Sequence, residues 1–196
     1  MTMNKTVVAF DFDGTLTSRD SFLLFTRFAV GGWHFWRGML RYLPQIVLIK
    51  AGLYPGGKLK EQLTRRFFEG WTEEKFDDLC RRFAAQYRHI LRPKGLACVE
   101  KACQEGAEVV VITASIANWV QPFLPDVRVI GTQMEVKGGA LTGLFSTPNC
   151  RGKEKVRRLK EAFPNRESYR LVAYGDSSGD KEMLNYADES HYRAFE

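Results

Sequence analysis

Four short runs of β-branched and apolar residues, without polar alternation, are spaced along the chain at 6–10, 108–113, 127–130 and 171–174. Such a run predicts a strand whose two faces are both covered, as in a parallel sheet. Helical stretches are predicted at 116–123, 153–163 and 181–186, after the second, third and fourth runs. This alternation predicts an α/β fold, a Rossmann-like parallel sheet with helices on both faces.

Two segments interrupt the alternation. Residues 133–145, with two consecutive glycines at their centre, predict an antiparallel β-hairpin. Residues 18–94 show apolar positions at helical spacing, are interrupted by glycines and prolines, and contain no clear strand. We therefore expect a core formed by residues 1–17 and 95–196, with residues 18–94 inserted after the first strand as a helical subdomain.

The composition is that of a folded protein, with 44% apolar and 27% charged residues. No apolar run approaches the ~18 residues needed to cross a bilayer. The N-terminus has neither the apolar segment nor the cleavage site of a secretory signal. The four cysteines form no CxxC pair and have no histidine at zinc spacing, so reduced thiols are expected. These features predict a cytoplasmic protein.

The net charge of +6 is concentrated in one block. Residues 18–101 carry 16 Lys or Arg against 8 Asp or Glu, whereas the rest of the chain carries 13 against 15. A basic block of this kind keeps open a nucleic-acid-binding module without catalysis. The residues that follow the predicted strands favour an enzyme instead.

Asp11 and Asp13 follow the first predicted strand, at the edge where open α/β sheets bind ligands. On extended backbone, side chains two residues apart point to the same side, so the pair could hold a divalent cation or act as nucleophile and proton donor. Gly14 allows a sharp turn that leaves backbone N–H groups facing an anion. The alternative is that Asp-Gly is ordinary turn chemistry.

The second predicted strand ends in Thr113-Ala114-Ser115. A hydroxyl and the N–H groups at the start of the next helix could hold an anion there, although Ser and Thr most often cap such a helix. Lys153 lies in a basic run that is typical of a solvated helix face, and composition alone assigns no function to one lysine within it.

Asp176 lies at the end of the fourth predicted strand, and Asp180 follows four residues later, near the start of a helix. The spacing suits a second carboxylate pair that reaches back to a metal site formed by the first pair. The alternative is a turn followed by a helix cap.

Together these motifs resemble those of the haloacid dehalogenase-like (HAD) hydrolase superfamily. Its first motif, an apolar strand followed by DxDxT, is matched by residues 7–17, and its last, GDxxxD, by residues 175–180. Its second motif, a strand that ends in Thr or Ser, is matched by Thr113. Its lysine, in or before a helix, is matched best by Lys153. The resemblance spans nearly the whole chain.

The resemblance implies a Mg²⁺-dependent phosphatase. Asp11 would attack the phosphorus and form an aspartyl-phosphate, while Asp13 would protonate the leaving alcohol and then activate water. The metal would be held by Asp11, the backbone carbonyl of Asp13 and Asp176, with Asp180 supporting the site. The phosphoryl group would be bound by Thr113, Lys153, Gly14 and Ala114.

Asp13 also indicates which reaction of the superfamily to expect, because its dehalogenases lack this second Asp. The resemblance therefore implies hydrolysis of a phosphate monoester, with a phosphotransferase or mutase as the alternative. The insert corresponds to a C1-type cap, so the chain most resembles subclass IB, the phosphoserine-phosphatase-like branch. The pattern at 150–153 is similar to a bacterial group that includes the type-C phosphatidylglycerophosphate phosphatases. No amino-acid-binding constellation is evident in the cap, so phosphoserine itself is not expected.

Residues 21–60 carry six basic residues, eight aromatic residues and no Asp or Glu. This composition suits a helix that lies on an anionic membrane surface. The protein would then be peripheral to the inner face of the membrane, and a phospholipid phosphate would be a candidate substrate. The alternative is that these helices pack inside the cap and that their basic side attracts a small phosphorylated substrate. Packing is the first expectation, because amphipathic helices usually face a core.

Overall fold

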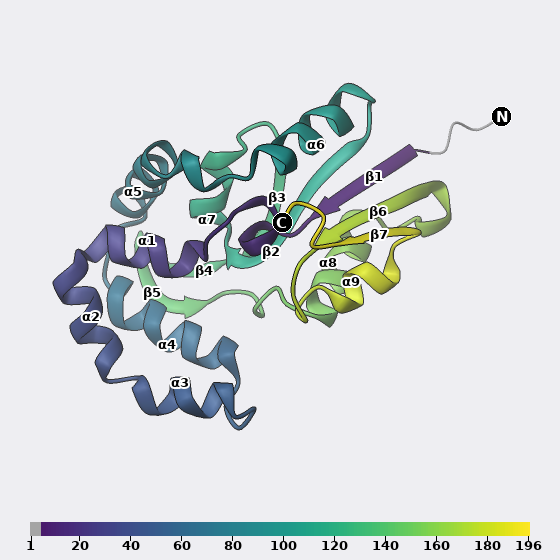
Figure 1. Ribbon diagram of the computed structural model, residues 1–196. Helices are drawn as coiled ribbons and strands as arrows, with labels where there is room; N and C mark the ends of the chain where they lie inside the picture. Colours follow the sequence, from purple (N-terminus) through teal and green to yellow (C-terminus); the bar gives the residue numbers. More distant parts are fainter. Residues whose placement is uncertain (1–4) are drawn as a thin grey trace.

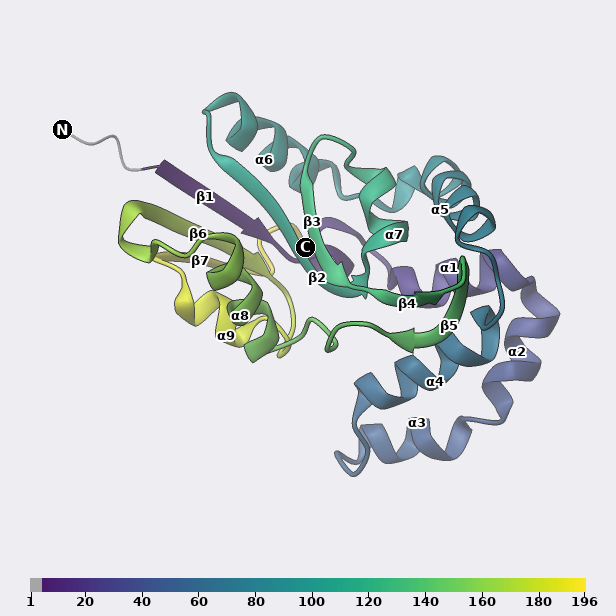
Figure 2. The same ribbon diagram turned by 180° about the vertical axis from the view of Figure 1, so that it is seen from behind.

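The computed structural model describes residues 5–196 and contains a five-stranded parallel sheet (Figure 1 and Figure 2). The strand order β3-β2-β1-β6-β7 places the first strand of the chain at the centre. These strands are β1 (Lys5–Phe10), β2 (Glu108–Ile116), β3 (Arg128–Thr132), β6 (Tyr169–Gly175) and β7 (Glu189–Tyr192). The predicted α/β class is confirmed, and a strand coincides with each of the four predicted runs, although β3 begins one residue after the start of its run.

Both faces of β1 are buried, which explains its uninterrupted apolar sequence. Val7 and Ala9 belong to a core cluster that includes α8 (Lys153–Ala162) and α9 (Lys181–Tyr186). Val8 and Phe10 belong to a second cluster that includes α6 (Pro93–Gln104). In Figure 1, α6 lies on one side of the sheet and α8 and α9 on the other. Helices on both faces are thereby confirmed.

Five α-helices occupy the chain between β1 and α6, as the helical spacing predicts. They are α1 (Ser21–Val30), α2 (Gly32–Leu40), α3 (Leu43–Lys50), α4 (Gly56–Phe68) and α5 (Glu73–Gln86). The aromatic side chains Phe25, Phe68, Phe76 and Phe83 are fully buried among them. The division into a cap at 18–94 and a core stays a prediction.

The predicted hairpin is present as β4 (Met134–Lys137) and β5 (Ala140–Phe145), but it packs on the helical insert. The Leu141 carbonyl accepts from the Gly70 N–H at 2.8 Å, and the Leu141 N–H donates to the Trp71 carbonyl at 2.8 Å. Gly143 is needed for this approach, because a Cβ there would lie 2.4 Å from the Cα of Arg65. The hairpin and the insert therefore form one packed unit.

Two elements differ from the sequence-based expectation. The helix predicted at 116–123 is shorter, because β2 continues to Ile116 and α7 (Ala117–Val120) gives way to a tighter turn that contains Pro122. The edge strand β7 is not predicted, because its sequence Glu-Ser-His-Tyr contains no apolar run.

Candidate active site

Asp11 lies at the end of the central strand, where its N–H donates to the Tyr174 carbonyl at 2.9 Å. The chain then enters an irregular turn, η1 (Phe12–Leu16), closed by a hydrogen bond from the Thr17 N–H to the Phe12 carbonyl at 3.0 Å. Gly14 has a φ of 84°, a conformation that favours glycine. This turn fixes the positions of both carboxylates of the first motif.

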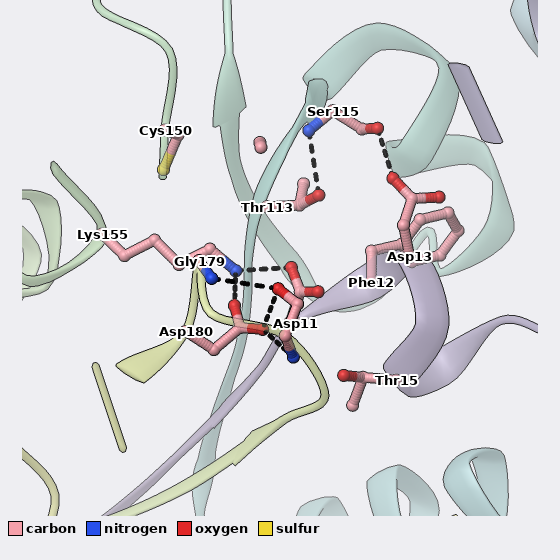
Figure 3. Close-up of polar contacts among 12 residues, drawn as sticks. Asp11, Phe12, Asp13, Thr15, Thr113, Ser115, Cys150, Lys155, Gly179 and Asp180 are labelled. Atoms are coloured by element: carbon pink, nitrogen blue, oxygen red, sulfur yellow. Dashed lines mark hydrogen bonds and ion pairs between the residues drawn. The ribbon is translucent and has the colours of Figure 1, made fainter. Parts of the chain in front are cut away.

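Lys155, on the first turn of α8, is the cation that reaches Asp11 (Figure 3). Its ammonium group lies 2.5 Å from Oδ1 of Asp11 and 2.6 Å from Oδ1 of Asp180, and its side chain is buried. Burial raises the pKa of Asp11 to about 7, although Lys155 opposes the shift. Burial lowers the pKa of Lys155, but the two carboxylates outweigh it and the net shift is upward.

The assignment of Lys153 to this role is wrong, because Lys153 is exposed and lines a depression between α8 and α9 with Lys160 and Glu182. The helix phase explains the difference. Lys155 precedes the buried Leu159 by four residues, so both occupy the face of α8 that packs on the sheet, whereas Lys153 does not. Counting back from Leu159 is the signal that identifies Lys155.

Asp13 points toward β2 and the start of α1, away from Lys155 (Figure 3). It accepts hydrogen bonds from the Ser115 hydroxyl at 2.5 Å and from the Ser21 N–H at 2.7 Å. Burial and the neighbouring Asp20 raise its pKa, while the two hydrogen bonds oppose the shift. The two carboxylates thus share one edge of the sheet but have different partners.

The residues predicted to bind the phosphoryl group lie at the same edge. The buried Thr113 hydroxyl accepts from the Ser115 N–H at 3.0 Å. The Gly14 N–H donates to the Thr17 hydroxyl over a long 3.3 Å, and the Ala114 carbonyl accepts from Lys60 at 2.9 Å. The phosphate-binding roles of Thr113, Gly14 and Ala114 stay predictions.

Asp176 and Asp180 arrive from the loop after β6. Oδ1 of Asp176 accepts from the Thr15 hydroxyl at 3.1 Å. Oδ2 of Asp180 accepts from the N–H of Ser177 at 3.0 Å and from its hydroxyl at 2.9 Å, while Oδ1 binds Lys155. Burial raises the pKa of Asp180, but Lys155 and these hydrogen bonds outweigh it and the net shift is downward. Asp180 therefore holds both the loop and the lysine in place.

A divalent cation fits this group of acids. One carboxylate oxygen from each of Asp11, Asp176 and Asp180 lies within 4.8 Å of the others. Burial raises the pKa of Asp176 as well as that of Asp11. Two ionised carboxylates are therefore unfavourable at this site unless a positive charge lies beside them. Lys155 supplies one positive charge against three acids, and carboxylate oxygens are the ligands that Mg²⁺ prefers.

A cavity of about 380 Å³ adjoins the site and extends toward the helical insert. Lys60 of α4 and Arg151 line it, together with Ile49, Gly57, Ala114 and Asn149. Burial lowers the pKa of Lys60, and Asp13 and Asp20 oppose this shift. Lys60 and Arg151 are not identified as site residues from the sequence, because no motif spacing connects residues that folding brings together from the insert and the core.

Comparison with known proteins gives three findings. The profile of the haloacid dehalogenase-like hydrolase family matches residues 8–185. Protein CicA of Caulobacter vibrioides is 40% identical over 196 aligned positions, which cover 96% of this chain and 86% of that protein. Two solved structures share the fold, a Bordetella pertussis Tohama I protein of unknown function and a substrate-bound phosphoserine phosphatase. Their TM-scores are 0.79 and 0.64, their identities 17% and 18%, and the matches cover 96% of this chain and 89% and 85% of theirs.

Proposed function

This chain belongs to the haloacid dehalogenase-like hydrolase family, and we propose that it is a Mg²⁺-dependent phosphatase that hydrolyses phosphate monoesters. The observation that carries the proposal is the environment of Asp11. This buried carboxylate ends the central strand, contacts one buried lysine and lies beside two further acids. Such a site can place a nucleophile, a cation and charge-neutralising groups around one phosphoryl group.

Asp11 is the proposed nucleophile. Lys155 binds its Oδ1, and no hydrogen bond from residues 5–196 reaches its Oδ2. In the first step this oxygen forms a bond to phosphorus while the bond to the leaving alcohol oxygen breaks, which gives an aspartyl-phosphate. Lys155 neutralises negative charge beside the reacting group and, with Asp180, keeps Asp11 in one orientation.

Asp13 is the proposed general acid and base. Its raised pKa favours the protonated form, which can give a proton to the leaving oxygen in the first step. In the second step the ionised Asp13 takes a proton from water, the water oxygen bonds to phosphorus, and Asp11 is released. Ser115 and the N–H of Ser21 hold the carboxylate in place for both transfers.

Mg²⁺ would be held by the carboxylates of Asp11 and Asp176, with the backbone carbonyl of Asp13. When bound, it supplies positive charge that stabilises the phosphoryl oxygens and the ionised form of Asp11. Asp180 keeps Lys155 and the loop that carries Asp176 in position. Thr113, whose hydroxyl lies at the end of β2, is the proposed hydrogen-bond donor to the phosphoryl group.

The similarity to a phosphoserine phosphatase, although it shows the fold alone, is compatible with this chemistry. Lys60 and Arg151 place two cations in the adjoining cavity, which suits a substrate that is anionic overall. The proposed substrate is therefore a small phosphorylated molecule or a phospholipid phosphate.

A panel of phosphate esters tests the proposal. Aryl, alkyl and lipid phosphates would be incubated with the protein in Mg²⁺ and in excess EDTA, with release of inorganic phosphate as the readout. We expect turnover of at least one ester in Mg²⁺ only. A protein that releases no phosphate from any of them, or one that is equally active in EDTA, would contradict the proposal.

A further inference from the structure

The large apolar side chains that face solvent are concentrated on α2, α3 and the turn after α3. The five most exposed in residues 5–196 all lie there: Trp33 at 75%, Leu53 at 74%, Val47 at 64%, Leu40 at 63% and Trp36 at 58%. With Leu43 they form what we call the α2–α3 surface. In both views these helices lie at an outer edge of the molecule, away from β7 and α9 (Figure 1 and Figure 2).

Helix α3 has the composition of a buried helix without being buried. Its sequence is Leu-Pro-Gln-Ile-Val-Leu-Ile-Lys, and none of its eight residues is buried within the described part of the chain. A helix that is apolar all round is normally found in a protein core or in contact with lipid. Exposed apolar patches of this kind mark surfaces that bind something.

The charged side chains of the segment that forms this surface have one sign. No Asp or Glu occurs between residues 21 and 60. Arg37, Arg41, Lys50 and Lys58 are exposed, and none of them forms an ion pair with another residue of 5–196. A partner that binds this surface must therefore offer both apolar groups and negative charge.

We propose that the α2–α3 surface docks on an anionic lipid bilayer. Trp, Leu and Val side chains would enter the boundary between headgroups and acyl chains, while the arginines and lysines would contact acidic headgroups. A second copy of the chain fits less well, because a symmetric contact would bring like charges together. A nucleic acid would match the charge but leaves the aliphatic side chains without a role.

Docking of this kind is peripheral. No helix among residues 5–196 is long and apolar enough to cross a membrane, and α2 and α3 have nine and eight residues. Ile49 of α3 also lines the cavity that contains Lys60 and Arg151, so the docked face adjoins the candidate active site. The docking proposal does not depend on the proposed reaction, since it uses no residue assigned to that chemistry.

Vesicle co-sedimentation tests the proposal on the full chain. Vesicles of phosphatidylcholine with phosphatidylglycerol would be compared with vesicles of phosphatidylcholine alone, at low and at high salt. We expect binding to the anionic vesicles that weakens as salt rises, because the electrostatic contribution is screened. Absence of binding to the anionic vesicles at low salt would overturn the proposal.

Matched variants locate the contact. Trp33→Ser with Trp36→Ser, and separately Arg41→Glu, should each lower the partition coefficient about tenfold or more. Tyr192→Ser is the apolar control, because Tyr192 is 57% exposed, against 58% for Trp36, but lies on β7. Arg128→Glu, on the exposed start of β3, is the charge control.

Thermal unfolding and gel filtration separate docking from other roles of the same side chains. We expect each variant to unfold within about 2 °C of the unaltered protein, because exposed substitutions cost little stability. Two results would overturn the proposal: controls that lose vesicle binding as fully as the α2–α3 variants, or a dimer that dissociates in the Trp variant while vesicle binding is unchanged.

Discussion

The ammonium group of Lys155 lies 2.5 Å from Oδ1 of Asp11, although 144 positions separate the two residues in the chain. The contact forms because α8 packs against the sheet through Leu159, one turn after Lys155, and so brings the lysine to the end of β1. Asp180 completes the arrangement from the loop after β6. The lysine therefore links three segments that are remote in sequence.

Lys155→Ala is expected to lower phosphatase turnover by about two to three orders of magnitude, the usual cost of removing one charge-stabilising group from an active site. Lys153→Ala is the matched control, because it removes the same charge from an exposed position of the same helix. Steady-state kinetics on an aryl phosphate measures the difference. Equal losses in the two variants would show that Lys155 has no special role.

Asp11→Asn should abolish turnover, because an amide cannot form the covalent intermediate, and losses of about 10⁴-fold or more are usual for a nucleophile. The fold should survive. Burial raises the pKa of Asp11, so a neutral side chain of the same shape removes an unfavourable charge in the absence of metal. Far-UV circular dichroism and thermal unfolding check the fold. Turnover close to that of the unaltered protein would exclude covalent catalysis by Asp11.

Asp13→Asn should harm alkyl phosphates more than aryl phosphates in the first step, since a good leaving group needs little help from an acid. The variant should also accumulate aspartyl-phosphate, because water is no longer activated. Rapid-quench measurement of phosphate bound to protein would detect this. If both substrate types are hydrolysed at the full rate, Asp13 takes no part in the reaction.

Mg²⁺ should raise the unfolding temperature, because it binds the folded site and neutralises buried carboxylates. Asp176→Asn should reduce that increase, while Asp126→Asn, an exposed control, should not. Differential scanning calorimetry with and without Mg²⁺ gives the comparison. An increase of the same size in all three proteins would place the metal elsewhere.

Gly14→Ala should inactivate the site by a steric route. A Cβ at Gly14 would lie 2.3 Å from Oδ2 of Asp176, so the acid must move. Gly106→Ala is the control, because Gly106 has a φ of 76° and no atom within 4 Å of the added Cβ. Both variants should lose about 1 kcal/mol of stability from backbone strain. Only Gly14→Ala should lose Mg²⁺-dependent turnover, and an active Gly14→Ala protein would contradict the proposed metal site.

The sequence predicts four of the five strands of the sheet and the places of the candidate acids for one reason. Strands covered on both faces leave uninterrupted apolar runs, and ligands bind where such strands end, so position makes Asp11, Asp13, Asp176 and Asp180 candidates, while their roles come from the family resemblance. The lysine requires more, because Lys153 and Lys155 share the same basic run and differ only in helix phase. Leu159 identifies Lys155 as the lysine on the buried face of α8. This step requires knowing that Leu159 lies on that face.

In the structure the aromatic residues of the segment 21–60 include one buried group and one exposed group. Phe22, Phe25 and Phe35 are buried, as packing predicts, whereas Trp33 and Trp36 are exposed. Composition could not separate these groups, since neighbouring aromatic residues on one helix can point in opposite directions. The division depends on how α2 lies against α4, where Gly38 meets the ring of Phe67. Such tertiary contacts leave no pattern in the local sequence.

The backbone pairing of Leu141 with Gly70 and Trp71 has a consequence for motion. If the helices after β1 swing away from the sheet, we expect β4 and β5 to travel with them, because separation would break these backbone hydrogen bonds. The insert and the hairpin would then move as one unit, which four chain segments connect to the core: two at the ends of the insert and two at the ends of the hairpin. Such a swing would require bending in all four segments. Substrate entry would thus be governed by bending near Thr17 and Leu91 and at the two ends of the hairpin.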